Sequence, residues 1–369
     1  MGLSMLDRLG EQFSAQLPFV AYRKPNGDGI RAIFQKDREL YPITDFNESG
    51  FVFAPFDTAD PAILLRNDES LNEIYMFNSP GGELRTKTDG EKDTEKEFHL
   101  QLIQKGISVI HLGPMKKVVL ARIMETKTPK SPFDLFQDML ANYPAAFCYI
   151  WYHPKVGLWL GATPEMFLET ENHRLSTMSL AGTRPYQGEE TPTWGKKELE
   201  EQEMVTRFII DSLRDKVTDL RVSDRESVRA GNLWHLKNVI SGTIHGTGLG
   251  EIINALHPTP AVCGLPKVLA KDFILRNEKY KRKYYTGFLG ELNFIEETTR
   301  PSTRRNQENR AYRTLKKRTS LYVNLRCMEM RGNKVSIFVG GGITKESVPE
   351  KEWEETRDKA RTMLNIIMK

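Results

Sequence analysis

The sequence predicts an α+β fold in which layered antiparallel sheets are flanked by helices. Short apolar runs with strand character recur from Lys117 onward, and turns containing Pro, Gly and Asn separate them, as in antiparallel meanders. Two longer segments instead repeat apolar residues at helical spacing. Meandering strands combined with amphipathic helices are typical of a layered α+β domain.

The predicted strands follow one another closely along the chain. In order they lie at residues 117–124, 146–152, 156–162, 165–169 and 174–182. Near the C-terminus, Leu321–Met330 and Lys334–Val339 flank Arg331-Gly332-Asn333, which predicts a hairpin. Arg326 falls within the first of these two apolar strands. A guanidinium there needs an anionic partner, either a ligand carboxylate or an internal salt bridge.

Two helices are predicted. In Lys196–Leu213, the apolar residues Val205, Phe208, Ile209 and Leu213 share one face. In Glu350–Met368, Trp353, Ala360, Met363, Leu364 and Ile367 do the same. Ser347 and Glu350 are spaced as a capping box, and Pro349 stands early in the helix, where proline is tolerated.

Length and composition predict a globular domain. The chain has 369 residues, of which 39% are hydrophobic and 28% charged, so a disordered or fibrous protein is excluded. Because no repeat or low-complexity linker divides it, we expect a single domain over residues 1–369 with a loosely attached N-terminal part. No apolar stretch approaches the roughly 20 residues of a membrane-spanning helix. The N-terminus lacks the long apolar run of a signal peptide.

Cysteine usage favours a cytoplasmic location. Cys148, Cys263 and Cys327 are odd in number and widely scattered, so they form neither a disulfide framework nor a zinc cluster.

Positive charge is concentrated in one segment. Residues 300–318 hold eight Lys or Arg and one acid, Glu308, for a local charge of +7 against +4 for the whole chain. Such a run could bind nucleic acid, but Tyr312 is its one aromatic residue, so the stacking platforms of single-strand binders are missing. We therefore interpret it as a solvated basic insertion.

Four carboxylates are candidate metal ligands. Glu201 lies one helical step behind the buried stripe of its helix, Glu198 lies one turn earlier, and Glu203 faces elsewhere. Glu352 and Glu355 form a second i, i+3 pair in the C-terminal helix, aligned with Lys359. The two pairs could hold Mg²⁺ through oxygen ligands. Helix-dipole compensation and a surface Glu355–Lys359 pair explain the same spacing.

Glycines form a second candidate site. Val339-Gly340-Gly341-Gly342-Ile343 follows a predicted strand, and its backbone N–H groups could receive a carboxylate. A tight exit from the strand would explain the glycines equally well. Lys117 and Glu165 stand at predicted strand edges, where pattern alone does not distinguish them from surface residues.

Taken together, these stretches resemble the chorismate-utilising enzymes, which include isochorismate, salicylate, anthranilate and aminodeoxychorismate synthases. The matching runs occur in the family's order; they are KVVLAR, GATPE, LAGTRP, LHPTPAVCGLPK, YYTGFLGELN, the strand around Arg326, GGGI and SVPEKEWEETRDKARTML. The resemblance covers Met115 to Lys369, whereas residues 1–110 match weakly. It implies the chorismate-binding fold of anthranilate synthase component I, a bound Mg²⁺ and chorismate as substrate.

The resemblance also implies roles for single residues. Lys117 matches the lysine that activates water, and Glu165 matches the general acid that protonates the departing hydroxyl. The implied metal ligands are Glu201 and Glu355, with Glu198 and Glu352 acting through water. The implied substrate-binding residues are Gly182, Thr183, His257, Arg326, Gly340, Gly342 and Lys359. A glutamate can serve as acid at neutral pH only if its surroundings raise its pKa.

Two features favour isochorismate synthase within the family. Ammonia-using relatives carry glutamine where Lys117 stands, so a lysine favours water as the nucleophile. The run Thr259-Pro260-Ala261-Val262-Cys263-Gly264 is similar to that of isochorismate synthases. The expected product feeds menaquinone synthesis, although a siderophore route would look alike. Departures from the family pattern are Gln202 in place of a histidine and Gly341 in place of an alanine.

Two other functions remain open. A salicylate synthase would share Lys117 and Glu165 and go on to eliminate pyruvate. A nucleic-acid- or partner-binding descendant would use the basic insertion. For the enzyme we expect no nucleic-acid or membrane partner, and a monomer or weak homodimer.

Overall fold

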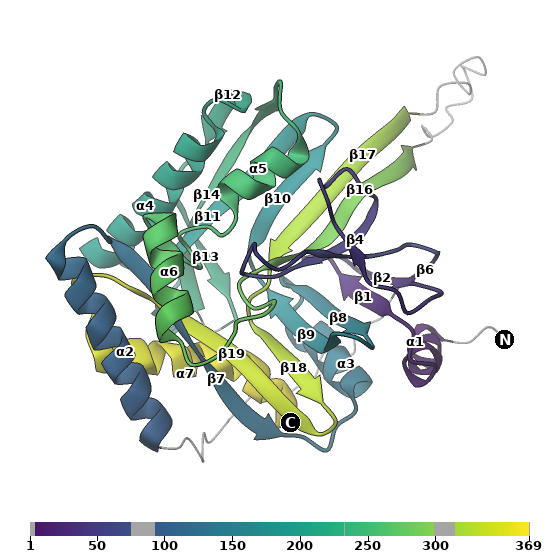
Figure 1. The fold of residues 1–369 in the computed structure, drawn as a ribbon, viewed down its shortest axis with the longest axis horizontal. Helices are drawn as coiled ribbons and strands as arrows, with labels where there is room; N and C mark the ends of the chain where they lie inside the picture. The colour runs from purple at the N-terminus through teal and green to yellow at the C-terminus, as the bar shows by residue number, and fades with distance from the viewer. Residues whose placement is uncertain (1–3, 75–92, 232, 299–313, 369) are drawn as a thin grey trace.

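The computed structural model describes residues 4–74, 93–231, 233–298 and 314–368, and these residues form two antiparallel sheets stacked between helices (Figure 1). The first sheet runs β15 (Gly264–Leu265), β7 (Lys117–Lys127), β19 (Lys334–Ile343), β18 (Cys327–Arg331), β9 (Gly157–Thr163), β8 (Phe147–His153), β1 (Phe19–Arg23), β2 (Gly29–Phe34) and β6 (Glu69–Ile74). The second runs β12 (Val217–Val222), β14 (Leu233–Ile244), β11 (Arg174–Pro185), β10 (Met166–Glu171), β17 (Thr314–Val323), β16 (Phe288–Thr298), β4 (Gly50–Ala54), β5 (Ile63–Leu65) and β3 (Tyr41–Pro42), with β13 (Glu226–Ala230) also paired to β14. The predicted α+β class with layered antiparallel sheets is confirmed.

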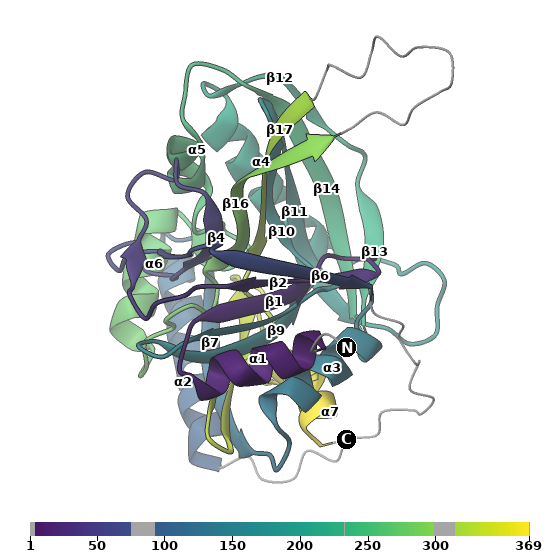
Figure 2. The ribbon, with the colours of Figure 1, turned by 90° about the vertical axis from the view of Figure 1, so that its right-hand side faces the viewer.

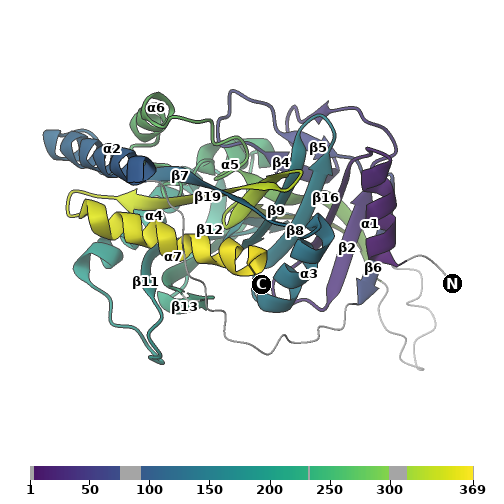
Figure 3. The ribbon, with the colours of Figure 1, turned by 90° about the horizontal axis from the view of Figure 1, so that it is seen from below.

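Helices cover the outer faces of both sheets. They are α1 (Met5–Ser14), α2 (Asp93–Leu112), α3 (Pro132–Asn142), α4 (Lys196–Leu213), α5 (Leu249–Leu256), α6 (Lys267–Asn277) and α7 (Pro349–Ile367). Helices α1, α3 and α7 pack on the first sheet, and α3 and α7 lie side by side when the molecule is seen from below (Figure 3). Helices α4 and α5 pack on the second sheet. None of the described helices is both long and apolar enough to cross a bilayer.

The aromatic core lies between the sheets. In β8, Phe147, Tyr149 and Trp151 face the second sheet, whereas Cys148 and Ile150 face the helices. Because both faces of the strand are buried, its sequence is a continuous apolar run rather than an alternating one.

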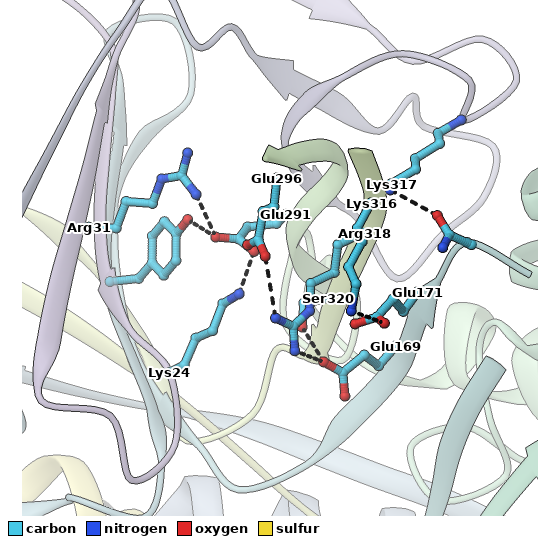
Figure 4. A network of polar contacts seen from close by, with 12 residues as sticks. Lys24, Arg31, Glu169, Glu171, Glu291, Glu296, Lys316, Lys317, Arg318 and Ser320 are labelled. Carbon is cyan, nitrogen blue, oxygen red and sulfur yellow. Dashed lines mark hydrogen bonds and ion pairs between the residues drawn. The ribbon is translucent and has the colours of Figure 1, made fainter. Parts of the chain in front are cut away.

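The N-terminal residues are part of both sheets, so the expectation of a loosely attached N-terminal part is wrong. β1 pairs with β8 on one edge and with β2 on the other, and β4 pairs with β16. Figure 2 shows β1 and β2 side by side. A polar network adds to this connection. Glu291 of β16 is buried and accepts hydrogen bonds from Tyr22 and Lys24, both at 2.5 Å, and from Arg31 at 3.3 Å (Figure 4).

Part of the basic segment is a strand. Residues 314–318 belong to β17, where Lys316 pairs with Glu171 at 2.7 Å and Arg318 with Glu169 at 3.0 Å (Figure 4). The interpretation as a solvated insertion is therefore wrong for these five residues. Residues 299–313 lie outside the described part of the chain.

Two local predictions near the C-terminus also need correction. The predicted strand Leu321–Met330 is two strands, since Arg326 has a φ of +47° and the chain passes there from the second sheet to the first. The hairpin after it is confirmed, with Arg331 paired to Lys334.

Helix α7 begins at Pro349 with Val348 as its N-cap and no side-chain cap, so the predicted capping box does not form. The Ser347 hydroxyl instead accepts a hydrogen bond from the Thr344 N–H.

Candidate active site

A cavity opens where the strand ends of both sheets meet α4 and α7. Of the predicted site residues, eight line it: Glu165, Gly182, Thr183, Glu201, Arg326, Gly340, Gly342 and Lys359. Lys117 lies directly behind Gly342, because a Cβ built on that glycine would be 3.0 Å from Lys117 Cε and 2.5 Å from Glu201 Oε1. A side chain at position 342 would therefore displace both groups. The structure thus brings nine of the predicted residues together.

The glycine run lies inside a strand rather than after one. Gly340, Gly341 and Gly342 are residues of β19 and pair with β7. Beyond Phe338, β19 has no register with β18, so this stretch is paired on one edge only within the described residues. An unpaired strand edge presents backbone N–H groups that can receive an anion.

Glu165 is a buried carboxyl at the turn between β9 and β10. Only 4% of it is exposed, and burial raises its pKa to about 8. The nearby cations Lys117, Lys359 and Arg326 act in the opposite direction and leave the carboxyl mostly protonated at neutral pH. This is the raised pKa that the role of general acid requires.

Lys117 is the first residue of β7 and is fully buried. Its Nζ lies 2.7 Å from Glu201 Oε1. Burial acts to raise the pKa of Glu201, but Lys117 and two further lysines outweigh it, and the pKa is lowered. Lys117 and one candidate metal ligand therefore form an ion pair in this structure.

Helix α7 supplies two more acids beside the same strand. Glu352 pairs with Lys197 at 2.6 Å and Glu355 with Lys359 at 2.6 Å, while Lys359 Nζ also donates to the Gly340 carbonyl at 2.9 Å. A Cβ built on Gly341 would lie 3.5 Å from Glu352 Oε2 and 3.7 Å from Glu355 Oε1. We call Glu201, Glu352 and Glu355 the acidic cluster.

Each acid of the cluster thus holds a lysine. No group of three or more His, Cys, Asp or Glu within the described residues is already gathered as metal ligands. The carboxylate oxygens nevertheless suit Mg²⁺, which prefers oxygen donors. They lie beside neighbouring glycines of β19, Glu201 next to Gly342 and the other two acids next to Gly341. The donor chemistry therefore fits the metal, although the ion pairs would have to rearrange.

Glu201 and Glu203 of α4 face as predicted, whereas Glu198 does not. Glu203 faces away from the cavity and pairs with Arg207 and Arg225. Glu198 does not line the cavity, because its carboxylate turns back to the start of the helix, 2.6 Å from a Cβ built on Gly195. Gln202 is buried against the second sheet and donates to Ser179 and Thr206.

The Arg326 guanidinium has no hydrogen-bond or ion-pair partner in the described part of the chain, whereas the backbone carbonyl of Arg326 accepts a hydrogen bond from the Ala162 N–H at 3.0 Å. Its side chain lines the cavity, and burial lowers its pKa from the usual value. The sequence left two partners open for Arg326, a ligand carboxylate or an internal salt bridge. The described residues form no such salt bridge. An unpaired guanidinium at a cavity wall is suited to a ligand carboxylate.

The histidine that lines the cavity is not the expected one. His257 does not line the cavity; its ring contacts Phe167 and Phe288, and its Nε2 lies 3.0 Å from the Pro55 carbonyl. His235 of β14 lines the cavity instead, with Nδ1 3.2 Å from the Gly182 carbonyl and 3.3 Å from Thr183 Oγ1. Burial lowers the pKa of His235 to about 3, so the ring is neutral.

Sequence reasoning missed His235 because it is a single residue in an alternating strand. Its position next to Thr183 comes from the pairing of β14 with β11, which joins residues 52 apart. Tyr285 and Thr286 also line the cavity and were not predicted. They lie within the quoted run YYTGFLGELN, so that run was the available signal.

Comparison with known proteins identifies the family. The family described as chorismate binding enzyme matches residues 62–299 and 312–365. The chain belongs to this family. The match omits residues 300–311 of the basic segment, and it begins earlier than the Met115 start of the resemblance.

Individual relatives agree with the family and the fold. The chain is 27% identical over 278 residues to isochorismate synthase EntC of Escherichia coli strain K12, which covers 72% of this chain and 66%, just under two thirds, of the relative. The structure of the menaquinone-specific isochorismate synthase MenF from Escherichia coli aligns with a TM-score of 0.78 and 21% identity, covering 100% of this chain and 92% of that one. Anthranilate synthase component I from Streptococcus pneumoniae aligns with a TM-score of 0.65 and 16% identity, covering 94% and 89%. The predicted fold family is confirmed.

Proposed function

We propose that the protein is an isochorismate synthase, which converts chorismate to isochorismate by adding water at C2 and releasing the C4 hydroxyl. The observation that carries the proposal is Glu165, a buried carboxyl with a pKa of about 8 in a cavity that Lys117 borders. A protonated acid and an amine base next to one cavity supply the two proton transfers that this reaction needs. The name and sequence similarity of EntC support the same activity.

The substrate is a dicarboxylate, and the cavity offers cations and donors for it. Arg326 has the guanidinium fork that matches one carboxylate. The backbone of Gly340 and Gly342, on the edge of β19 that β18 leaves free, suits the other carboxylate. His235, being neutral, can hydrogen-bond a ring substituent without adding charge.

Glu201 and Glu355 would hold Mg²⁺, and Glu352 would support them. When bound, the ion offsets the charge of the substrate's ring carboxylate and of the acids around it. Glu198 points away from this place, so its predicted water-mediated role needs a change of rotamer.

The two proton transfers balance. Lys117 pairs with Glu201 as an ammonium, so it must first lose a proton to act as the base. Its neutral Nζ then takes a proton from the attacking water as the oxygen of that water bonds to C2 of the ring. The ring double bonds shift, the C4–O bond breaks, and the Glu165 carboxyl gives its proton to the departing hydroxyl, which leaves as water. One water enters and one leaves, so the reaction is an isomerisation. The prediction that its product feeds the menaquinone route stays a prediction.

Product separation tests the proposal. The protein incubated with chorismate and Mg²⁺ should release isochorismate up to an equilibrium mixture, and it should give no anthranilate when ammonium is added. A matched reaction with a chelator should be inactive. Salicylate and pyruvate in equal amounts as the main products would overturn the proposal in favour of a salicylate synthase.

A further inference from the structure

Lys197 lies beside the acidic cluster and forms an ion pair with Glu352. Its Nζ is 2.6 Å from Glu352 Oε1, and it stands on α4 one turn before Glu201. Burial acts to lower its pKa, but Glu352 first, then Glu355 and Glu201, outweigh burial, and the pKa of Lys197 is raised. The direct contact of this ammonium is with Glu352, and the charges of Glu355 and Glu201 act on it from further away.

The cluster needs such a cation when no metal is present. Glu352 is 2% exposed, and burial together with the neighbouring Glu355 raises its pKa. Glu355 has its own counter-charge in Lys359, so the carboxylate that depends on Lys197 is Glu352. A buried carboxylate without a counter-charge is costly, because water does not compensate its charge. Lys197 holds Glu352 Oε1, while Glu352 Oε2 faces Gly341 and has no hydrogen-bond partner among the described residues. A divalent cation at the acidic cluster would add positive charge beside the Lys197 ammonium, so the two cations compete for the negative charge of Glu352.

A second cavity lies next to the side chain of Lys197. Lys197 lines this second cavity of about 270 Å³, on the side of α4 that faces residues 344–346. The charged residues that line this cavity besides Lys197 are Glu200, Glu346, Lys116 and Lys345. An ammonium that left Glu352 would find two carboxylates there, which it would share with two other lysines. The stem of a lysine side chain is flexible enough for this rearrangement.

We propose that Lys197 is the internal cation of the acidic cluster: it neutralises Glu352 in the metal-free protein and moves into the second cavity when a divalent cation binds the carboxylates. This inference rests on the magnesium site of the proposed function. It makes Lys197 a competitor that sets how tightly the free protein holds the metal.

Calorimetric titration of the substrate-free protein with Mg²⁺ tests the competition. Removing a charge that close to the ligands should tighten Mg²⁺ binding by Lys197→Met at least about tenfold. Lys196→Met is the matched control, since Lys196 is the preceding residue, is 81% exposed and pairs only loosely with Glu200 at 3.6 Å. Equal or weaker binding by Lys197→Met than by the wild type would overturn the inference. Absence of Mg²⁺ binding in the wild type and both variants would instead overturn the metal site, and the inference with it.

Thermal unfolding gives an independent measurement. In a chelator, Lys197→Met should unfold at a lower temperature than the wild type, because Glu352 is left without its cation, and Mg²⁺ should restore the loss. The double variant Lys197→Met/Glu352→Gln should recover stability in the chelator, since the unpaired charge is gone. If the single variant folds only with Mg²⁺, that rescue is the predicted result. Equal unfolding temperatures of Lys197→Met and Lys196→Met in the chelator would contradict the role.

Discussion

At the scale of single residues, burial decides the chemistry of Glu165. A carboxyl with a pKa of about 8 is protonated through the neutral range and loses its proton as the pH rises through 8. Since a general acid must carry its proton, we expect turnover to fall on the alkaline side with an apparent pKa of about 8.

Glu165→Gln keeps the shape of the side chain and removes the acid. We expect it to lower turnover about 10²-fold or more and to remove the alkaline limb of the pH profile, while the fold survives. Glu203→Gln, which changes an exposed carboxylate outside the cavity, is the control. Near-normal turnover of Glu165→Gln would show that another group supplies the proton.

Residue chemistry was easier to predict from sequence than residue position. Lys117, Glu165 and Arg326 lie in or beside one cavity as expected, because motifs of fixed order carried them. His257 and His235 are both buried and neutral, and nothing local distinguishes them. Which one reaches the cavity depends on the register of β14 against β11, a long-range pairing that no local pattern records.

At the scale of elements, helical periodicity was the most reliable signal. The predicted bounds of α4 are those of the structure, because a buried stripe repeats over 18 residues. The predicted capping box of α7 does not form, because it requires Ser347 as the N-cap. The N-cap is instead the next residue, Val348, and the helix begins at Pro349. The strand through Arg326 failed because an apolar run does not reveal a residue with a φ of +47° or a change of sheet.

The face of α4 makes a testable distinction between two glutamates. Glu201 meets Lys117 and Gly342 inside the cavity, whereas Glu203 pairs with two surface arginines. We expect Glu201→Ala to raise the Mg²⁺ concentration needed for half-maximal activity far more than Glu203→Ala. Activity measured against Mg²⁺ concentration for both variants is the test. Equal shifts would mean that Glu201 is not a metal ligand.

At the scale of the whole molecule, each of the two sheets is completed by pairings between segments that are distant in the chain. β1 pairs with β8 and β4 with β16, so the N-terminal strands complete both sheets. Sequence patterns predicted the strands but not which strands pair, because pairing depends on contacts between residues that are far apart in the chain. That is why the N-terminal part was misjudged while the α+β class was not.

The basic segment allows a test at the same scale. Residues 300–311 fall between the two family-matched stretches, and β16 and β17 pair up to Thr298 and Thr314. Replacing residues 301–312 by a short Gly/Ser linker should leave chorismate turnover largely intact, because the cavity residues all lie elsewhere. Tight, salt-sensitive binding of nucleic acid that is lost on deletion would contradict this and support a binding function.

The central claim, that a solvent water adds at C2 while the C4 hydroxyl leaves, is tested most directly by isotope labelling. Early in a reaction run in ¹⁸O-labelled water, each isochorismate formed should carry one ¹⁸O at C2, and Lys117→Ala should form the product about 10²-fold more slowly. Mass spectrometry of the separated product measures both. Isochorismate that contains no solvent oxygen would mean that the original hydroxyl migrates, and it would contradict the roles assigned to Lys117 and Glu165.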